Sequence, residues 1–417
     1  MARPDRTDAV NRRIQRGQFW WLAANVLLVG ATLGVERTIV PLLGRDIYHI
    51  GSAVALTFIA SFGLTKALLN LSAGRWSDRV GRLPILRLGW VAGIPLVILL
   101  MTVHQWWAVV AANVFLGANQ GLAWTMTVTA QLDVVEPGLR GLAMGINEAM
   151  GYLGVAGATV AAGVLGAGGH LETRPFVFTG GVVAIGLAMS LLVIRETRTR
   201  PGSGPANPAN RTSFSAIFHD ATWRHPALGT LTAGGLLNKL ADTAAWGVLP
   251  LYLARQHEAV AAISVIAGIY GGVWGFAQFG TGLLSDHTGR KPLIVVGLVL
   301  LGGGLAGMVA VVGTTGWSIA AGVMGLGMAL VYPVLNAAVA DVAAPQDRGA
   351  ILGVYRLWRD GGYAVGGLGI GLLMAAVGIR WSLGIVSGLV LAGALFLALR
   401  LPETYRLPQK EGRHVRS

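Results

Sequence analysis

Long apolar stretches alternate with short polar turns along the whole chain. Several of these stretches exceed the roughly 20 apolar residues that a helix needs to cross a hydrocarbon core of about 30 Å. The turns between them contain charged residues, Gly or Pro, which end helices. The pattern therefore predicts twelve membrane-spanning helices, six in each half of the chain. Their approximate ranges are 18–43, 51–73, 83–103, 106–131, 141–166, 175–194, 226–252, 260–283, 292–313, 317–341, 349–377 and 380–400.

The polar segments outside these spans divide the chain into five parts. Residues 1–17 form an N-terminal tail, and residues 401–417 form a C-terminal tail. The segment 195–225 is rich in Pro, Gly, Ser and Arg, which is typical of a flexible linker. This linker separates two six-helix bundles, 18–194 and 226–400. The predicted fold class is therefore an all-α membrane protein with two pseudo-symmetric bundles.

The composition agrees with a lipid environment. Hydrophobic residues make up 54% of the chain and charged residues 12%, about half the charged share of a soluble globular protein. The 61 glycines suit helices that pack closely inside a bilayer. Cysteine is absent, which excludes disulfides and thiolate metal sites.

The net charge of +13 would suggest a nucleic-acid partner in a soluble protein, but its distribution gives another reason. If the N-terminus is cytoplasmic, most of the 32 Lys and Arg residues fall in the tails and loops of the cytoplasmic side. The loops of the other side contain only Arg45, Arg174, Arg255 and Arg380. Membrane proteins carry their basic loops inside, so we expect both termini in the cytoplasm and no nucleic-acid partner.

Two short polar phrases occur twice in the chain. The phrase GRWSDRVGRLP at 74–84 returns as GLLSDHTGRKP at 282–292. The phrase DVVEPGLRG at 133–141 returns as DVAAPQDRG at 341–349. Both repeats lie 208 residues apart, so one offset relates two unrelated motifs. A shared offset predicts a duplicated six-helix unit, a known build of transporters that bind their substrate between the halves.

With these motifs the chain resembles the major facilitator superfamily over essentially its whole length. The family signature G-x-x-x-D-x-x-G-R-[KR] occurs in the loop after the second span of each half, with Leu83 in the final basic position of the first copy and Lys291 in the second. The resemblance implies transport by alternating access. The drug/proton antiporter branch is a looser match, because Gly117 replaces the Arg of its R-x-x-Q-G motif and the fifth span lacks a Gly-Pro pair.

The resemblance also implies contacts between the halves at the cytoplasmic rim. Placed as in the family, Asp78 would approach the positive N-terminus of span 349–377, and Asp286 that of span 141–166. Such contacts would form only when the cytoplasmic side is shut, and each would contribute about 0.3–2 kcal/mol. The alternative is a set of ordinary juxtamembrane charges. The residues of this predicted latch are Asp78, Arg82, Arg140, Asp286, Arg290 and Arg348.

Charged residues also occur inside the predicted spans. Each costs about 2.5–3.5 kcal/mol at a helix centre, so we expect these side chains to face a cavity or one another. They are candidates for substrate binding or proton coupling, and the alternative role is a static ion pair that fixes helix packing, as for Lys66 or the Arg359–Asp360 pair. The complete set is Glu36, Arg37, Lys66, Glu148, Lys239, Asp242, Arg356, Arg359 and Asp360.

Spans 18–43 and 226–252 are equivalent in the two halves, and in the family they line the central cavity. Lys239 and Asp242 lie three residues apart, so they can pair on one helical face. We expect polar and aromatic side chains to complete the cavity wall. These are Asn119, Gln120, Trp124, Asn238, Trp246, Tyr332 and Asn336.

Glu148 and Arg356 occupy equivalent positions in the two halves but carry opposite charges. This difference suggests a titrating group in one half and a fixed charge in the other. A buried carboxylate that gains and loses a cationic neighbour can load and release a proton. Glu148 is therefore the first candidate for the proton carrier, with Asp242 and Glu36 as rivals.

The remaining motifs exclude other chemistry. The eight histidines lack metal-ligand spacing, and no GxxxxGK[ST] loop is present, so we expect no metal, no cofactor, no ATP-driven pump and no enzyme.

The sequence predicts a monomeric transporter of the bacterial plasma membrane that exports a small molecule, driven by the proton motive force. An importer or exchanger of a small anionic metabolite is the alternative, favoured by the excess of basic residues in the spans. A non-transporting receptor or assembly protein is a further alternative, which the dense buried charge disfavours.

Overall fold

The computed structural model describes residues 6–136, 139–198, 213–344 and 347–405, which are helical along most of their length. The helices of the first half are α1 (Arg6–Asp46), α2 (Thr57–Val80), α3 (Arg82–Thr102), α4 (Trp106–Asn119), α5 (Thr125–Val134), α6 (Arg140–Gly166) and α7 (Arg174–Leu192). The second half contains α9 (Pro226–Thr243), α10 (Leu249–Arg255), α11 (Val260–Thr288), α12 (Arg290–Ala310), α13 (Thr314–Val342), α14 (Arg348–Val377) and α15 (Ile379–Arg400).

Two π-helical turns each join two α-helices into one continuous helical rod. Gln120–Trp124 joins α4 to α5, and Ala244–Val248 joins α9 to α10. Such turns insert one extra residue into a helix and often occur at functional sites. The fourth and seventh predicted spans therefore each form one rod in the described structure.

The predicted duplication reappears in the helix bounds. α3 and α12 begin and end 208 residues apart, and so do α13 and the rod that runs from α4 to α5. Gly81 and Gly289, which precede α3 and α12, take φ angles of 105° and 89°. Only glycine adopts this backbone region without strain. The backbone conformation thus explains why the duplicated motif has a glycine at this position in both halves.

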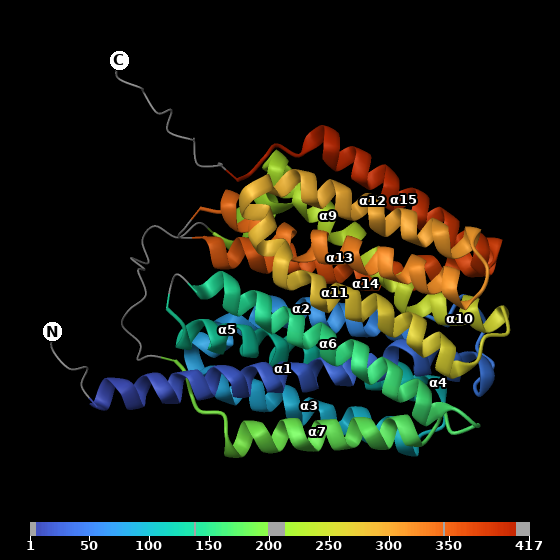
Figure 1. The fold of residues 1–417 in the computed structure, drawn as a ribbon, viewed down its shortest axis with the longest axis horizontal. Coiled ribbons are helices and arrows are strands. Elements are labelled where there is room, and N and C mark those ends of the chain that lie inside the picture. Colours follow the sequence, from blue (N-terminus) through green and yellow to red (C-terminus); the bar gives the residue numbers. More distant parts are fainter. Residues whose placement is uncertain (1–5, 137–138, 199–212, 345–346, 406–417) are drawn as a thin grey trace.

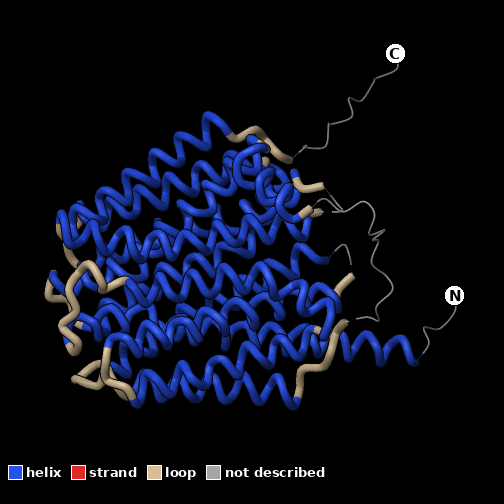
Figure 2. Tube along the Cα trace, turned by 180° about the vertical axis from the view of Figure 1, so that it is seen from behind, coloured by secondary structure: helices blue, strands red, loops and turns tan. Residues whose placement is uncertain are grey.

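The helices lie side by side with the loops gathered at their two ends (Figures 1 and 2). α1 begins, and α7 and α15 end, at one of these ends, which we call the terminal face. The other end, where α1 ends and α15 begins, is called the opposite face. The first half forms one side of the molecule and the second half the other (Figure 1). α6 packs against α11 and α2 against α14 across the boundary between the halves.

Among the described residues, nine helices are long and apolar enough to cross a membrane. In α1 this part begins at Gly17, although the helix itself starts at Arg6 because no Gly or Pro interrupts residues 6–16. Large apolar side chains such as Leu192, Phe276 and Leu399 are exposed on the outer surface, as expected for helices that contact lipid. The chain is therefore a multi-pass membrane protein, and the total of twelve spans stays a prediction.

The predicted linker is not irregular throughout. Residues 199–212 lie outside the described part of the chain, but α8 (Phe214–His219) and the π turn Asp220–Arg224 follow them. Ser213 caps α8 by accepting a hydrogen bond from the backbone N–H of Ala216. Ile217 and Ala221 are buried where these turns pack against α9 and α14. The expectation of a flexible linker is therefore wrong for this segment, because its apolar side chains dock on the second half.

Candidate functional site

A cavity of about 690 Å³ lies between the two halves. Its wall includes Arg140 and Arg348, which begin α6 and α14 at the terminal face. From there it reaches inward to Lys66 on α2 and Glu148 on α6. The cavity is therefore open at the terminal face and ends in the middle of the molecule.

The cavity wall contains four of the seven predicted polar and aromatic wall residues, namely Gln120, Trp124, Tyr332 and Asn336. The other three are buried within the helix packing instead. Asn119 donates a hydrogen bond to the backbone carbonyl of Gly89, and Asn238 contacts the sulfur of Met328. Trp246 is buried against Phe58 and Phe62 of α2.

Asp242 lies at the centre of a polar cluster beyond the inner end of the cavity. Its two carboxylate oxygens accept hydrogen bonds from Nη1 and Nη2 of Arg37, at 2.8 and 3.0 Å. Lys239 Nζ lies 3.2 Å from Oδ2, which confirms the predicted pair on one face of α9. The phenol groups of Tyr270 and Tyr363 also donate to this carboxylate. A fully buried carboxylate is stable here because it has two cations and two further donors.

The Arg37–Asp242 pair connects the two halves, since Arg37 belongs to α1 and Asp242 to α9. Further toward the opposite face, the Trp246 ring packs edge to face on Phe58 and Phe62, at centroid distances of 5.7 and 5.0 Å. These contacts bring α2 against the π turn of the other half. The ion pair and the apolar contact together close the opposite face.

Glu148 and Arg356, the equivalent positions with opposite charges, both lie on the cavity wall. Glu148 Oε1 accepts a hydrogen bond from Trp124 Nε1 at 3.0 Å, while its Oε2 has no protein partner among the described residues. Arg356 Nε likewise has no partner in the described part of the chain. Lys66 Nζ lies 5.5 and 5.6 Å from the ring centres of Phe62 and Trp124.

A second polar connection between the halves involves Asp360. Asn70 of α2 donates a hydrogen bond to this carboxylate, and Thr125 donates to the Oδ1 atom of Asn70 at 2.9 Å. Arg359 lies 2.8 Å from Asp360, so these neighbours form the expected ion pair. Arg359 also lines the cavity, which means that the pair joins its wall to the α2–α14 interface.

Glu36 lies away from the cavity, on the side of α1 that faces α4. Its Oε2 accepts a hydrogen bond from Asn113 at 3.1 Å, and its Oε1 has no partner in the described residues. The side chain is only 1% exposed. Glu36 is therefore the exception to the expectation that charged residues inside the spans face a cavity or one another. The other eight either line the cavity or form ion pairs.

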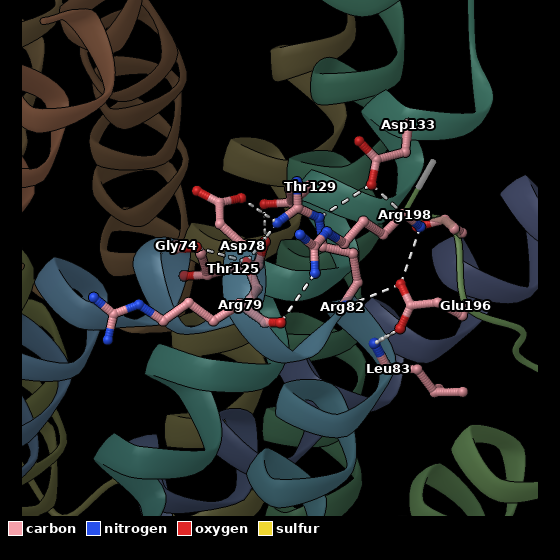
Figure 3. Close-up of polar contacts among 12 residues, drawn as sticks. Gly74, Asp78, Arg79, Arg82, Leu83, Thr125, Thr129, Asp133, Glu196 and Arg198 are labelled. Carbon is pink, nitrogen blue, oxygen red and sulfur yellow. Dashed lines mark hydrogen bonds and ion pairs between the residues drawn. The ribbon is translucent and has the colours of Figure 1, made fainter. Parts of the chain in front are cut away.

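The duplicated rim motif folds in the same way in each half. Arg82 binds Asp78 at 2.7 Å and Asp133 at 3.1 Å, and Glu196 accepts hydrogen bonds from the backbone N–H groups of Arg82 and Leu83, each at 3.0 Å (Figure 3). In the second half the corresponding residues are Arg290, Asp286, Asp341, Lys291 and Glu403.

These contacts stay within one half. Among the described residues, no ion pair joins Asp78 to α14 or Asp286 to α6, and Arg140 and Arg348 lie at the cavity mouth. Because the terminal face is open here, the latch between the halves is not formed in this conformation and stays a prediction.

The sequence analysis missed the roles of Glu196 and Glu403. Each caps the N-terminus of a helix more than 100 residues before it, a contact that local spacing does not reveal. The available signal was the Glu-Thr pair that follows the last span of each half. Partial burial alone would raise the pKa of Glu196, but hydrogen bonds from the backbone N–H groups of Arg198, Arg82 and Leu83 lower it overall.

No group of three His, Asp or Glu side chains in the described ranges is arranged to hold a metal ion. The arrangement instead offers a central cavity with charged and aromatic walls, closed at one face by contacts between the halves. Such a cavity can hold a small molecule and expose it to one side of the membrane.

Comparisons with known proteins agree with this architecture. The chain is 23% identical over 298 residues to the class E tetracycline resistance protein of Escherichia coli, which covers 67% of this chain and 69% of that protein. It is 26% identical over 358 residues to a protein of Cupriavidus pinatubonensis named as a probable 4-methylmuconolactone transporter, covering 82% and 81% of the two chains.

Among solved structures, a bacterial homologue of the human lysosomal transporter Spinster, in an inward-facing and unoccupied conformation, matches with a TM-score of 0.74. The two share 17% sequence identity, and the match covers 92% of this chain and 97% of the other, which shows a common fold. The family model described as Major Facilitator Superfamily matches residues 22–238 and again residues 231–416. The chain therefore belongs to the major facilitator superfamily and is a membrane transporter.

Proposed function

We propose that this protein is a secondary active transporter that carries a small organic molecule across the bacterial plasma membrane by alternating access. The observation that carries the proposal is the cavity between the halves, open at the terminal face and closed toward the opposite face by the Arg37–Asp242 pair and the Trp246 contacts. The charge asymmetry of the loops supports a cytoplasmic position of the terminal face. On this reading the structure is the inward-open state.

Transport is coupled to protons through Glu148. This carboxylate faces the open cavity, has one unbonded oxygen and lies near the cations Lys66 and Arg356. A proton from the cytoplasm can reach it here, and a neighbouring cation that moves with the other half would change its charge state. Asp242 is the first rival, because it would lose Arg37 when the opposite face opens. Glu36 is the second, although it lies away from the cavity in this state.

Two directions of transport have separate support. Export of a small molecule agrees with the name of the tetracycline resistance protein to which the chain is similar. Import or exchange of a small anion agrees with the surplus of basic side chains on the cavity wall. The coupling through Glu148 is common to both. No catalytic activity and no resident cofactor are needed for either.

The purified protein in vesicles with an internal pH indicator tests this function. A panel of uncharged, cationic and anionic compounds is added under an imposed proton gradient. We expect proton movement only with a transported compound, and its loss in Glu148→Gln. The control is Glu136→Gln, which removes an exposed carboxylate outside the cavity.

Retained coupling in Glu148→Gln contradicts the role of Glu148, and Asp242→Asn and Glu36→Gln then identify the carrier. Flux that is independent of pH in the wild type contradicts proton coupling. Absence of flux for every compound in the panel contradicts transport and favours a receptor or assembly protein.

A further inference from the structure

We propose that the inner end of the cavity binds an organic anion with a flat apolar body, its charged group between Lys66 and Arg356 and its body against Trp124 and Tyr332. The inference rests on the proposed function and names the substrate class of the same cavity. Its argument starts from the charge of the wall.

Cations outnumber carboxylates on the cavity wall. Eight charged side chains line it in the described part of the chain, and two of them are acidic. The basic ones are Lys66, Arg140, Arg290, Arg348, Arg356 and Arg359, and the acidic ones are Glu148 and Asp286. A water-filled cavity of this composition concentrates anions and repels cations.

At the inner end of the cavity, the surplus positive charge comes from Lys66 and Arg356. Arg290 and Arg359 have carboxylate partners in Asp341 and Asp360, at 3.0 and 2.8 Å. In contrast, neither Lys66 nor Arg356 forms an ion pair with a carboxylate of the described residues.

Glu148 lies near both of these cations but forms an ion pair with neither. Lys66 is only 7% exposed, and Arg356 Nε has no hydrogen-bond partner. Asp360 is also near both cations, but it is already paired with Arg359. A buried Lys66 beside a half-buried Arg356 is costly unless a further anion neutralises this charge. A bound carboxylate would supply that charge and the missing acceptor for Arg356 Nε.

The rings beside these cations select the body of the ligand. Tyr152 stacks on Trp274 with centroids 3.5 Å apart, and Trp124 and Tyr332 pack against this pair at 5.2 and 5.6 Å from the Tyr152 ring. Trp124 and Tyr332 therefore hold fixed positions on the cavity wall. Rigid aromatic side chains bind flat apolar groups by stacking or edge contacts.

Amide side chains with unpaired polar atoms around the same space would bind polar substituents of the ligand. Both side-chain polar atoms of Gln278 lack partners, and so do Asn336 Oδ1 and Gln120 Oε1, among the described residues. All three side chains line the cavity. Buried polar atoms without hydrogen-bond partners are rare in folded proteins, and a bound polar molecule would satisfy these atoms. The cavity thus has side chains that can bind the charged group, the flat apolar body and the polar substituents of such a ligand.

A series of probes with one body and three charges tests the inference. Radiolabelled 1-naphthoate is bound to the purified protein in detergent, and its neutral amide and the 1-naphthylmethylammonium cation compete. We expect the carboxylate to bind. The amide and the cation should compete with an affinity at least about 10-fold lower, because each lacks one charge-assisted hydrogen bond. Equal or stronger competition by the amide or the cation overturns the proposal, as does absence of naphthoate binding up to about 1 mM.

Variants locate the site. Lys66→Gln and Arg356→Gln should each weaken naphthoate binding about 10- to 100-fold, whereas Lys66→Arg should keep most of it. Arg255→Gln is the matched control, because it removes an exposed cation outside the cavity. Thermal unfolding midpoints within about 5 °C of the wild type show that the variants fold. Unchanged binding in both Gln variants overturns the proposed position.

The same vesicles separate this inference from the proposed function. Naphthoate that binds but does not cross the membrane supports the anion site and contradicts transport of that compound class. Flux of the amide or the cation without naphthoate flux supports transport and overturns the anion site.

Discussion

Asp242 has partners from both halves of the molecule, and one of them, Arg37, must leave if the opposite face opens. The remaining partners, Lys239, Tyr270 and Tyr363, belong to its own half and can stay with it. The carboxylate therefore need not become an isolated buried charge in the other state. A pair with this arrangement can separate at moderate cost.

Arg37→Gln should shift the equilibrium toward the form that is open at the opposite face. The substitution removes the ion pair between the halves while Lys239 still neutralises Asp242. Because the chain has no cysteine, Leu56→Cys gives a single probe in the closed contact beside Gly247. In Arg37→Gln this cysteine should react with a membrane-impermeant maleimide about 10-fold faster than with Arg37 present. That factor corresponds to a shift of about 1.4 kcal/mol in the equilibrium between the two forms.

The control for this prediction is Arg255→Gln in the same Leu56→Cys background, which should react at the unchanged rate. Equal labelling in Arg37→Gln and the control would contradict a role of the ion pair in closing this face.

Glu196→Gln should destabilise the protein by about 0.5–2 kcal/mol through the loss of the α3 cap. The pKa of Glu196 is lowered in the folded state, so ionised Glu196 contributes stability above its ordinary value of 4.5. That contribution is lost as the pH falls through the lower folded value. The difference in thermal unfolding midpoint between wild type and variant should therefore be constant near neutral pH and shrink below about pH 4.5.

Glu136→Gln provides the comparison, since this exposed carboxylate caps no helix in the described contacts. A midpoint difference for Glu196→Gln that does not change with acidification would show that the backbone hydrogen bonds do not depend on the carboxylate charge.

At the scale of the helix, the sequence allowed the spans to be placed well, because apolar runs and polar turns alternate sharply. α12 begins at Arg290 and α14 at Arg348, within two residues of the predicted starts. The π turns were not predicted, since an extra residue in a helix leaves no composition signal. The helical segment Phe214–Arg224 was also missed, because the Pro and Gly residues before it dominate the local composition.

Close helix packing predicts a difference between two neighbouring glycines of α6. A Cβ atom at Gly154 would collide with the backbone oxygen of Leu27 in α1, whereas one at Gly157 would meet nothing within 4 Å. Gly154→Ala should therefore cost about 1–3 kcal/mol by overpacking. Gly157→Ala should be neutral or stabilising by up to about 1 kcal/mol, because alanine favours the helix.

Thermal unfolding of both variants in one detergent checks this prediction. Equal midpoints for the two variants would contradict the close approach of α1 and α6.

At the scale of the whole molecule, the duplicated motifs were enough to predict two bundles and a cavity between them. They were not enough to predict which side chains meet inside it. Arg37 and Asp242 were both named as functional candidates, but their contact depends on how the halves are tilted, which no motif encodes. Asn119 and Asn238 were expected on the wall for their polarity alone, yet both are buried within the helix packing, where Asn119 donates to the backbone carbonyl of Gly89 and Asn238 Nδ2 contacts the sulfur of Met328.

The alternating movement of the halves is the central claim, and distances between spin labels on the two faces test it directly. One pair of labels at Gly141 and Gly349 spans the cavity mouth, and a second pair at Ile47 and Gln256 spans the opposite face; all four positions are exposed. In lipid nanodiscs, Arg37→Gln should shorten the first distance and lengthen the second relative to the wild type. Two distances that stay fixed, or that change in the same direction, would contradict the account.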